Sequence, residues 1–208
     1  MKFLLYIAFE YGFPIVRPLQ EEIIKRGYNV AWFIENEDSK KHLQPSEKLL
    51  NTVQEVIQYQ PDAVLAASNE VPHFFSGIKV QVFHGFSVNK RSKNKGHFRI
   101  RGFFDLYCTQ GPSTTKHFKK LAKKHKHFDI VETGWPKVDV LFPIENNNQD
   151  NPVIFLASTF TERLSLAHNV KVYNEILNLI ETENWKWIIN LHPKMDKEIV
   201  KKFNHYSL

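Results

Sequence analysis

The sequence predicts an α/β protein built on parallel sheets. Short apolar runs of strand length alternate along the 208 residues with segments in which apolar residues recur at helical spacing. Glycine and proline separate many of these segments. Such alternation is typical of a parallel sheet with helices on both faces, which is a Rossmann-like lobe. Since 42% of the residues are apolar, the chain can bury a sizeable core.

Residues 1–143 contain the elements of a first lobe. The predicted strands are Lys2–Phe9, Val30–Ile34, Ala63–Ala67, Ile78–Phe83, Leu106–Thr109 and Phe128–Val131. The predicted helices are Pro14–Lys25, Glu47–Tyr59 with Ser46 as its cap, a basic helix from Gly111-Pro112-Ser113 to about Lys126, and a short stretch at Val138–Phe142. The first run resembles a signal peptide, but it lacks a small-residue cleavage site and we interpret it as a strand.

Residues 144–152 form the predicted linker, because Pro143–Pro152 is nearly devoid of apolar residues and is bracketed by prolines. The pattern then restarts in residues 153–208. The expected elements are strands Val153–Ala157 and Trp187–Leu191 and helices Leu164–Ile180 and Met195–Phe203. A doubly wound lobe normally needs about twice as many elements, so we expect the second Rossmann-like lobe to be incomplete and the chain to be a fragment.

Positive charge is concentrated in one part of the chain. The net charge is +6, and twelve Lys or Arg with a single acid, Asp105, lie between Gly85 and His127. A local block of this kind indicates an anionic partner: a nucleotide diphosphate, a polyphosphate chain, an anionic membrane or a nucleic acid. Nucleic acid is the weakest of these, since no recognisable binding motif accompanies the block.

Several classes of chemistry are disfavoured by composition. The single cysteine, Cys108, excludes an intrachain disulfide and reads as a small core residue. No apolar run is long enough to span a membrane. His117, His125 and His127 lack neighbouring acids or cysteines at metal-ligand spacing, so no metal site is predicted. Neither familiar glycine-rich phosphate loop is present, and no cofactor is expected.

The sharpest candidate for chemistry is His84-Gly85, directly after a predicted strand. Ligands bind at the carboxyl ends of strands in open α/β sheets, and a histidine there can exchange a proton near neutral pH. Lys90 and Arg91 follow within the basic block. The position of His84 alone favours neither of two interpretations: it is a general base, or it only caps the strand end by hydrogen bonding.

Three further strand ends carry polar groups. Gly134-Trp135-Pro136-Lys137 follows one strand, and taken alone it is better read as a tight turn into a helix. Ser158 and Thr159, with Arg163 nearby, offer donors for a phosphate, although helix capping by a hydroxyl is also common. His192 ends the last predicted strand, ahead of Pro193.

Taken in order, these motifs resemble those of the CDP-glycerol glycerophosphotransferases, which include teichoic-acid primases and polymerases and related capsule polymerases. The resemblance runs from about Ile78 to the C-terminus. It rests on His84-Gly85 with Lys90, Gly111-Pro112-Ser113, Thr133-Gly134-Trp135-Pro136-Lys137-Val138-Asp139, Ser158-Thr159-Phe160 and Leu191-His192-Pro193.

The resemblance implies a transferase of the two-lobed GT-B type that moves glycerol phosphate from CDP-glycerol to a hydroxyl. It implies that His84 is the general base and that His192 and the Ser158-Thr159 region face the donor. Other residues expected to contact substrate are Gly85, Lys90, Arg91, Gly134, Pro136, Lys137 and Arg163. The implied partners are the nucleotide-activated donor, an anionic polymer or lipid-linked acceptor, and the inner, cytoplasmic face of the membrane.

Two features depart from the family pattern. Lys137 stands where the family often has arginine, which removes bidentate geometry. The family's later motif, an acidic residue followed by serines, has no counterpart before Leu208. Two alternatives therefore stay open: a nucleotide-sugar glycosyltransferase or epimerase on the same scaffold, and a non-catalytic basic lobe that binds a membrane or polyanion.

Overall fold

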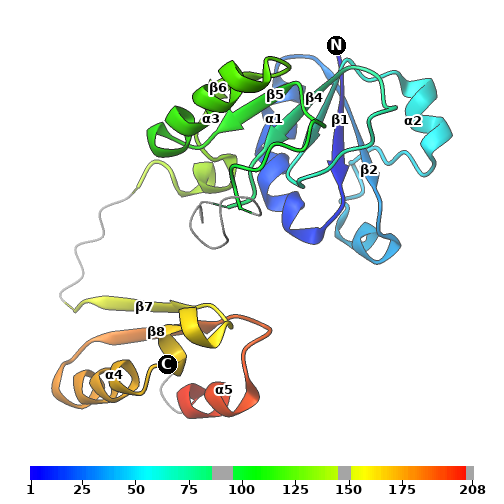
Figure 1. Cartoon of the computed structure of the whole chain (residues 1–208). Coiled ribbons are helices and arrows are strands. Elements are labelled where there is room, and N and C mark those ends of the chain that lie inside the picture. Colours follow the sequence, from blue (N-terminus) through cyan, green and yellow to red (C-terminus); the bar gives the residue numbers. More distant parts are fainter. Residues whose placement is uncertain (86–95, 145–150, 205–208) are drawn as a thin grey trace. The chain divides into compact units, whose positions relative to one another are not determined.

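The computed structural model describes residues 1–85, 96–144 and 151–204 (Figure 1). Lys90 and Arg91 lie outside these residues. The chain divides into two compact units, Met1–Ile144 and Glu145–Leu208. Within the described ranges, no helix combines the length and apolar character needed to cross a bilayer.

The first unit contains a six-stranded parallel sheet, which confirms the predicted α/β class. Its strands are β1 (Lys2–Ile7), β2 (Asn29–Ile34), β3 (Ala63–Ala66), β4 (Ile78–Val82), β5 (Leu106–Thr109) and β6 (Asp129–Glu132). The strand order is β2-β1-β3-β4-β5-β6, with every described pair parallel. All six carboxyl ends therefore meet at one edge of the sheet.

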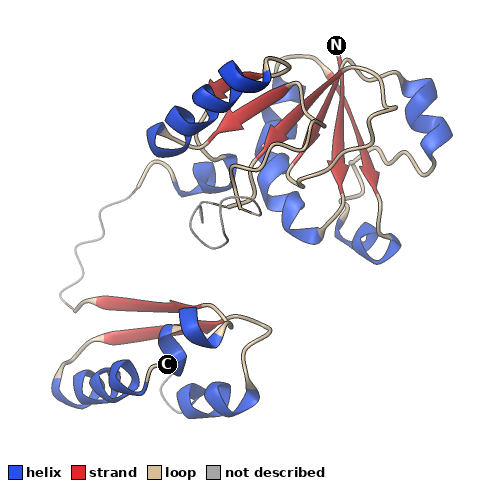
Figure 2. Cartoon of the chain, viewed as in Figure 1, coloured by secondary structure: helices blue, strands red, loops and turns tan. Residues whose placement is uncertain are grey.

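Helices cover both faces of this sheet (Figure 2). Helix α1 (Phe13–Lys25) packs through Ile15 and Val16 against the face that carries Leu5 and Val82. Helices α2 (Val53–Tyr59) and α3 (Pro112–His125) cover the opposite face. Buried apolar residues on both faces are what a parallel sheet requires for stability.

The predicted helix Glu47–Tyr59 is wrong at its start. Helix α2 begins at Val53, where the Thr52 hydroxyl accepts a hydrogen bond from the Glu55 N–H at 3.1 Å, so Thr52 rather than Ser46 is the cap. The preceding residues are extended, and Leu49 forms a parallel bridge with Trp32. Buried Glu47 pairs with Arg17 of α1 at 2.9 Å, which holds this segment out of a helix.

The second unit is a smaller α/β structure. Strands β7 (Val153–Ser158) and β8 (Lys186–Leu191) pair in parallel. Helices α4 (Val170–Thr182) and α5 (Lys197–Asn204) pack on one face around a core that contains Ile176, Trp187 and Phe203. On the other face, Phe155 of β7 and Ile188 of β8 are exposed.

The predicted helix Leu164–Ile180 also starts too early. Two short 3₁₀ helices, η4 (Glu162–Leu164) and η5 (Leu166–His168), precede α4. The Asn169 side chain caps α4 by accepting from the Lys171 and Val172 N–H groups. Because Asn169 competes with the helix interior for these donors, the helical register restarts there.

Candidate functional site

The first unit has its topological switch point between β1 and β3. The chain order reverses across this pair, since β2 lies on one side of β1 and β3 to β6 follow on the other. In open α/β sheets, ligands bind outside the carboxyl ends of the strands at such a point. The loops that follow β1, β3 and β4 therefore define the candidate site.

His84 lies at this edge, two residues beyond the end of β4. Its Nδ1 atom is 3.0 Å from the carbonyl oxygen of Ala67, which follows β3. The Tyr11 ring, from the loop after β1, lies 4.8 Å from the imidazole ring. Connections from three strands thus meet at one exposed histidine.

The hydrogen bond to Ala67 determines the tautomer of His84. A carbonyl oxygen only accepts, so Nδ1 carries the proton and Nε2 of the neutral ring holds a lone pair. Among the described residues, none forms a hydrogen bond to Nε2. The imidazole is therefore oriented to accept a proton from a ligand. The strand-cap reading of this histidine holds as well, because Nδ1 does bond the neighbouring strand end.

The predicted turn at Gly134-Trp135-Pro136 comes to the same place. The indole N–H of Trp135 donates to the carbonyl oxygen of Phe83 at 2.8 Å, directly before His84. Gly134 has a φ of +82°, which favours glycine, and Pro136 begins the 3₁₀ helix η3 (Pro136–Leu141). Lys137 places its ammonium 5.5 Å from the centre of the Trp135 ring.

Sequence reasoning missed the contribution of His97. Its ring packs 4.5 Å from Phe83, and its Nε2 is buried with no hydrogen-bond partner in the described part of the chain. Burial, and secondarily the positive charge of nearby His84, lower the pKa of His97 to about 4. No local pattern in the sequence marks this contact, because Phe83 and His97 lie on opposite sides of residues 86–95 in the sequence.

Sequence reasoning also missed Gln110. It follows β5 directly, and its side-chain oxygen and nitrogen are both buried without partners among the described residues. The β4–β5 register ends with Val82 opposite Cys108, and His84 and Gln110 each lie two residues beyond that pair, at the same edge of the sheet. The signal available in the sequence was the position of Gln110, a polar residue directly after the predicted strand Leu106–Thr109.

The second unit places His192 directly after β8, as the sequence predicts. Its Nδ1 accepts a hydrogen bond from the Lys194 N–H at 3.0 Å, and its ring lies 4.5 Å from that of Phe160. Because a backbone N–H only donates, Nδ1 is unprotonated and Nε2 of the neutral ring carries the proton. This imidazole is therefore oriented to donate.

The polar residues near His192 differ in burial and in hydrogen bonding. Ser158 is buried, and its hydroxyl pairs with that of Ser165 at 2.9 Å and accepts from the Ala167 N–H at 3.2 Å. Thr159 is half-buried, and Arg163 is exposed on η4. The Ser158 hydroxyl thus has a structural role in ordering η4 and η5, and a role of these three residues in substrate binding stays a prediction.

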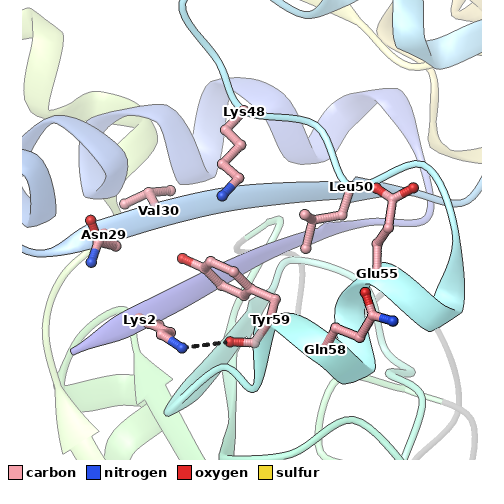
Figure 3. A pocket seen from close by; sticks show the side chains of 8 residues that line it. All are labelled: Lys2, Asn29, Val30, Lys48, Leu50, Glu55, Gln58 and Tyr59. Carbon is pink, nitrogen blue, oxygen red and sulfur yellow. Dashed lines mark hydrogen bonds between the residues drawn. The ribbon is translucent and has the colours of Figure 1, made fainter.

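A separate cavity of about 510 Å³ lies at the amino ends of β1 and β2 (Figure 3). Its lining includes Lys2, Lys48 and Tyr59, and both ammonium groups lie within 6 Å of the Tyr59 ring centre. The Lys2 ammonium already donates to the Tyr59 carbonyl oxygen at 3.1 Å. This cavity is at the edge of the sheet opposite to His84 and is not part of the candidate site.

Comparisons with known proteins return similar folds only. No protein-family model and no curated protein matches the sequence. Among solved structures, the chain is similar to the glycosyltransferase VinC in complex with DTDP, at 11% identity and a TM-score of 0.46, over 98% of this chain and 69% of that one. It is similar to the E. coli heptosyltransferase WaaC with ADP, at 12% identity and a TM-score of 0.41, over 97% and 77%.

An imine reductase variant from Myxococcus stipitatus in complex with NAD+ is also similar, at 8% identity and a TM-score of 0.32. The match covers 91% of this chain and 53% of the reductase, so the chain spans about half of that protein's length. At these TM-scores the similarities say nothing about activity.

Proposed function

We propose that this chain belongs to a two-lobed transferase that moves glycerol phosphate from CDP-glycerol to a hydroxyl of a cell-envelope polymer or lipid-linked acceptor. The observation that carries the proposal is the orientation of His84 at the switch point. Its Nδ1–H is fixed on the Ala67 carbonyl, which places the lone pair of the neutral ring on Nε2, the atom that can take a proton. The order of motifs that resembles the CDP-glycerol glycerophosphotransferases supplies the substrate class.

In the proposed reaction, Nε2 of His84 takes the proton of the acceptor hydroxyl as its oxygen attacks the β-phosphorus of CDP-glycerol. A new phosphorus–oxygen bond forms to the acceptor, and the bond to the oxygen bridging the two phosphates breaks. The electron pair leaves with CMP. Cations and N–H donors that stabilise charge on the transferring group lower the barrier.

Several residues are candidates for that stabilisation. Lys137 is beside the Trp135 ring that anchors the His84 segment. In the second unit, the Nε2–H of His192 is a donor, and exposed Arg163 is a cation of bidentate geometry. We assign His192 and Arg163 to the donor phosphates, and Lys137, Gly85 and the Gly134-Pro136 turn to the surface around the acceptor.

The basic face of α3 supports a peripheral position at the inner surface of the membrane. Its lysines are exposed, and they comprise Lys116, Lys119, Lys120, Lys123 and Lys124. Each cation near an anionic surface can contribute about 1 kcal/mol of binding. An anionic polymer or membrane surface is therefore the expected partner of this helix.

Donor specificity in a transfer assay tests the proposal. The protein, with any further segments of its native gene product, is supplied with CDP-glycerol or a UDP-sugar and a lipid-linked acceptor, and the release of CMP or UDP is measured. We expect CMP release with CDP-glycerol and its loss in His84→Gln. The matched control is His127→Gln, at an exposed histidine before β6 on the opposite edge, which should keep the wild-type rate.

Release of UDP without CMP would instead identify a nucleotide-sugar glycosyltransferase. A wild-type rate in His84→Gln would overturn the role of His84. Absence of any transfer, together with salt-dependent binding to anionic vesicles, would favour the non-catalytic membrane-binding lobe.

A further inference from the structure

The loop between β1 and α1 presents two exposed aromatic rings beside His84. Phe9 and Tyr11 stack with ring centroids 5.5 Å apart and planes 18° apart, and the Tyr11 ring continues to the imidazole of His84 at 4.8 Å. Phe9 is 59% exposed and Tyr11 is 40% exposed. Neighbouring apolar rings left open to solvent are a feature of binding surfaces.

We infer that Phe9 and Tyr11 form a platform that binds the acceptor through the apolar face of an uncharged sugar ring. The inference rests on the function proposed above, since it supplies the acceptor class for the same site. A ligand that uses His84 must present a hydroxyl to Nε2, and a ligand that covers Phe9 and Tyr11 must present an apolar face. A sugar ring offers both, with C–H groups on its face and hydroxyls at its edge.

The charges of the loop favour a neutral ring over a phosphate chain. Residues 8–12 include one acid, Glu10, and no cation. The Glu10 carboxylate lies 3.3 Å from His42 Nε2 and 3.9 Å from Lys41 Nζ, and it remains partly exposed. An anionic polymer would find no free positive group on this loop, whereas the hydroxyls of a sugar can donate to the carboxylate.

The platform is held in position by the backbone of the loop. The Gly12 N–H donates to the Phe9 carbonyl oxygen at 2.9 Å, which closes the short 3₁₀ helix η1 (Glu10–Gly12). A Cβ at Gly12 would lie 2.9 Å from the Ile7 Cδ1 atom, so glycine lets the loop pack closely against β1. A surface ordered before binding loses less conformational entropy when the ligand arrives.

The test is binding of N,N′-diacetylchitobiose, a neutral disaccharide, to the whole chain by saturation-transfer NMR, with cytidine and a glycerol phosphate oligomer as competing probes. We expect Phe9→Ala to weaken disaccharide binding about tenfold, the upper range for loss of one aromatic contact. Phe74→Ala is the matched control, because Phe74 is 55% exposed and packs on Phe75 instead of near His84. It should bind as the wild type does.

Since the Phe9 side chain is mostly exposed, its replacement should leave the fold intact, which circular dichroism checks. In the transfer assay, Phe9→Ala should raise the acceptor KM and leave the CDP-glycerol KM unchanged. Tyr11→Phe, which keeps the ring, should retain disaccharide binding. No disaccharide binding by the wild type, equal affinity in Phe9→Ala, or binding of cytidine or the oligomer alone would each overturn the platform.

The two proposals fail separately. Disaccharide binding needs no donor, so binding without transfer from CDP-glycerol would leave the platform standing and remove the proposed reaction. Transfer from CDP-glycerol with no change in acceptor KM in Phe9→Ala would support the proposed reaction and overturn the platform.

Discussion

The two strand-end histidines of this chain look alike in sequence and differ in chemistry. His84 uses Nδ1 to donate to the carbonyl of Ala67, seventeen residues earlier and directly after strand β3. His192 uses Nδ1 to accept from the backbone N–H of Lys194, within its own turn. In the neutral rings, Nε2 is consequently an acceptor in His84 and a donor in His192.

This difference shows that the partner of one ring nitrogen sets the role of the other. A hydrogen-bond acceptor and a hydrogen-bond donor can thus be built from the same residue at the same kind of position, as the roles proposed for His84 and His192 require. In the first unit, the partner of the histidine Nδ1 comes from a distant part of the chain. In the second unit, it comes from the same turn.

Exchange of each histidine for glutamine should separate the two roles and produce the largest effect. Glutamine keeps an N–H donor near the Nε2 position but cannot accept a proton from a hydroxyl. We therefore expect His84→Gln to lower the rate of glycerol phosphate transfer by at least about 100-fold. His192→Gln should lower it by only about tenfold and His192→Ala by more, since one hydrogen bond to a charged group contributes about 1.5–3 kcal/mol.

Equal losses in the two glutamine variants would mean that the roles are not divided as the hydrogen bonds indicate. Thermal unfolding of each variant serves as the control for folding.

Ser158 provides the next largest effect and tests how the second unit is held. Ser158→Ala leaves the Ser165 hydroxyl and the Ala167 N–H without this partner, so it should destabilise the unit by about 1–3 kcal/mol. Hydrogen exchange of the β7 and β8 amides measures the loss. Ser113→Ala, at an exposed serine of α3, is the matched control and should change stability by less than about 0.5 kcal/mol.

If Ser158→Ala instead left exchange unchanged and only weakened donor binding, Ser158 would be a substrate ligand first and a structural residue second.

Trp135 tests whether the first unit positions His84 through distant contacts. Trp135→Phe removes the indole N–H that donates to the Phe83 carbonyl, at an expected cost of about 1 kcal/mol in urea unfolding. The transfer rate should fall as the His84 segment loosens, with the donor KM unchanged. Unaltered stability and rate would show that this anchor is dispensable.

His97 should give the smallest effect at neutral pH, because it is neutral there. Unfolded His97 binds a proton near its ordinary pKa of 6.5, while the folded residue does so near 4. The unfolded state thus holds more protons between these values, and the free energy of unfolding should fall as pH drops from 6.5 to 4. His97→Leu should flatten this dependence in urea titrations, and exposed His127→Gln should leave it in place. Identical profiles for His97→Leu and the wild type would contradict the assignment.

Local sequence patterns predicted much of the fold. The alternation of apolar runs located the eight strands of the described residues to within a few residues, because the apolar run that marks each strand is local. The helix start at Glu47 was wrong because Leu50 fits a helical spacing with Val53, while the partners that keep this segment extended, Arg17 and Trp32, lie far away in sequence. The start at Leu164 was wrong for a local reason, since the Asn169 side chain caps α4 and begins the helix there.

The candidate site was predictable only in part, because its contacts also join residues that lie far apart in sequence. Strand-end position identified His84 and His192, and the positive φ of Gly134 agrees with the turn predicted there. The contacts from Trp135, Ala67 and His97 to the His84 segment each join separate loops, and no spacing in the sequence encodes them.

The parallel order of the first unit also shapes how this site can change over time. Every loop at the carboxyl edge belongs to a different crossover, so Phe9 and Tyr11 reside on one connection, His84 on a second and Trp135 on a third. Insertions and substitutions accumulate in such connections without disturbing the strands beneath. Under the proposed function, substitutions in the β1–α1 connection alone can therefore change the acceptor preference while His84 is conserved.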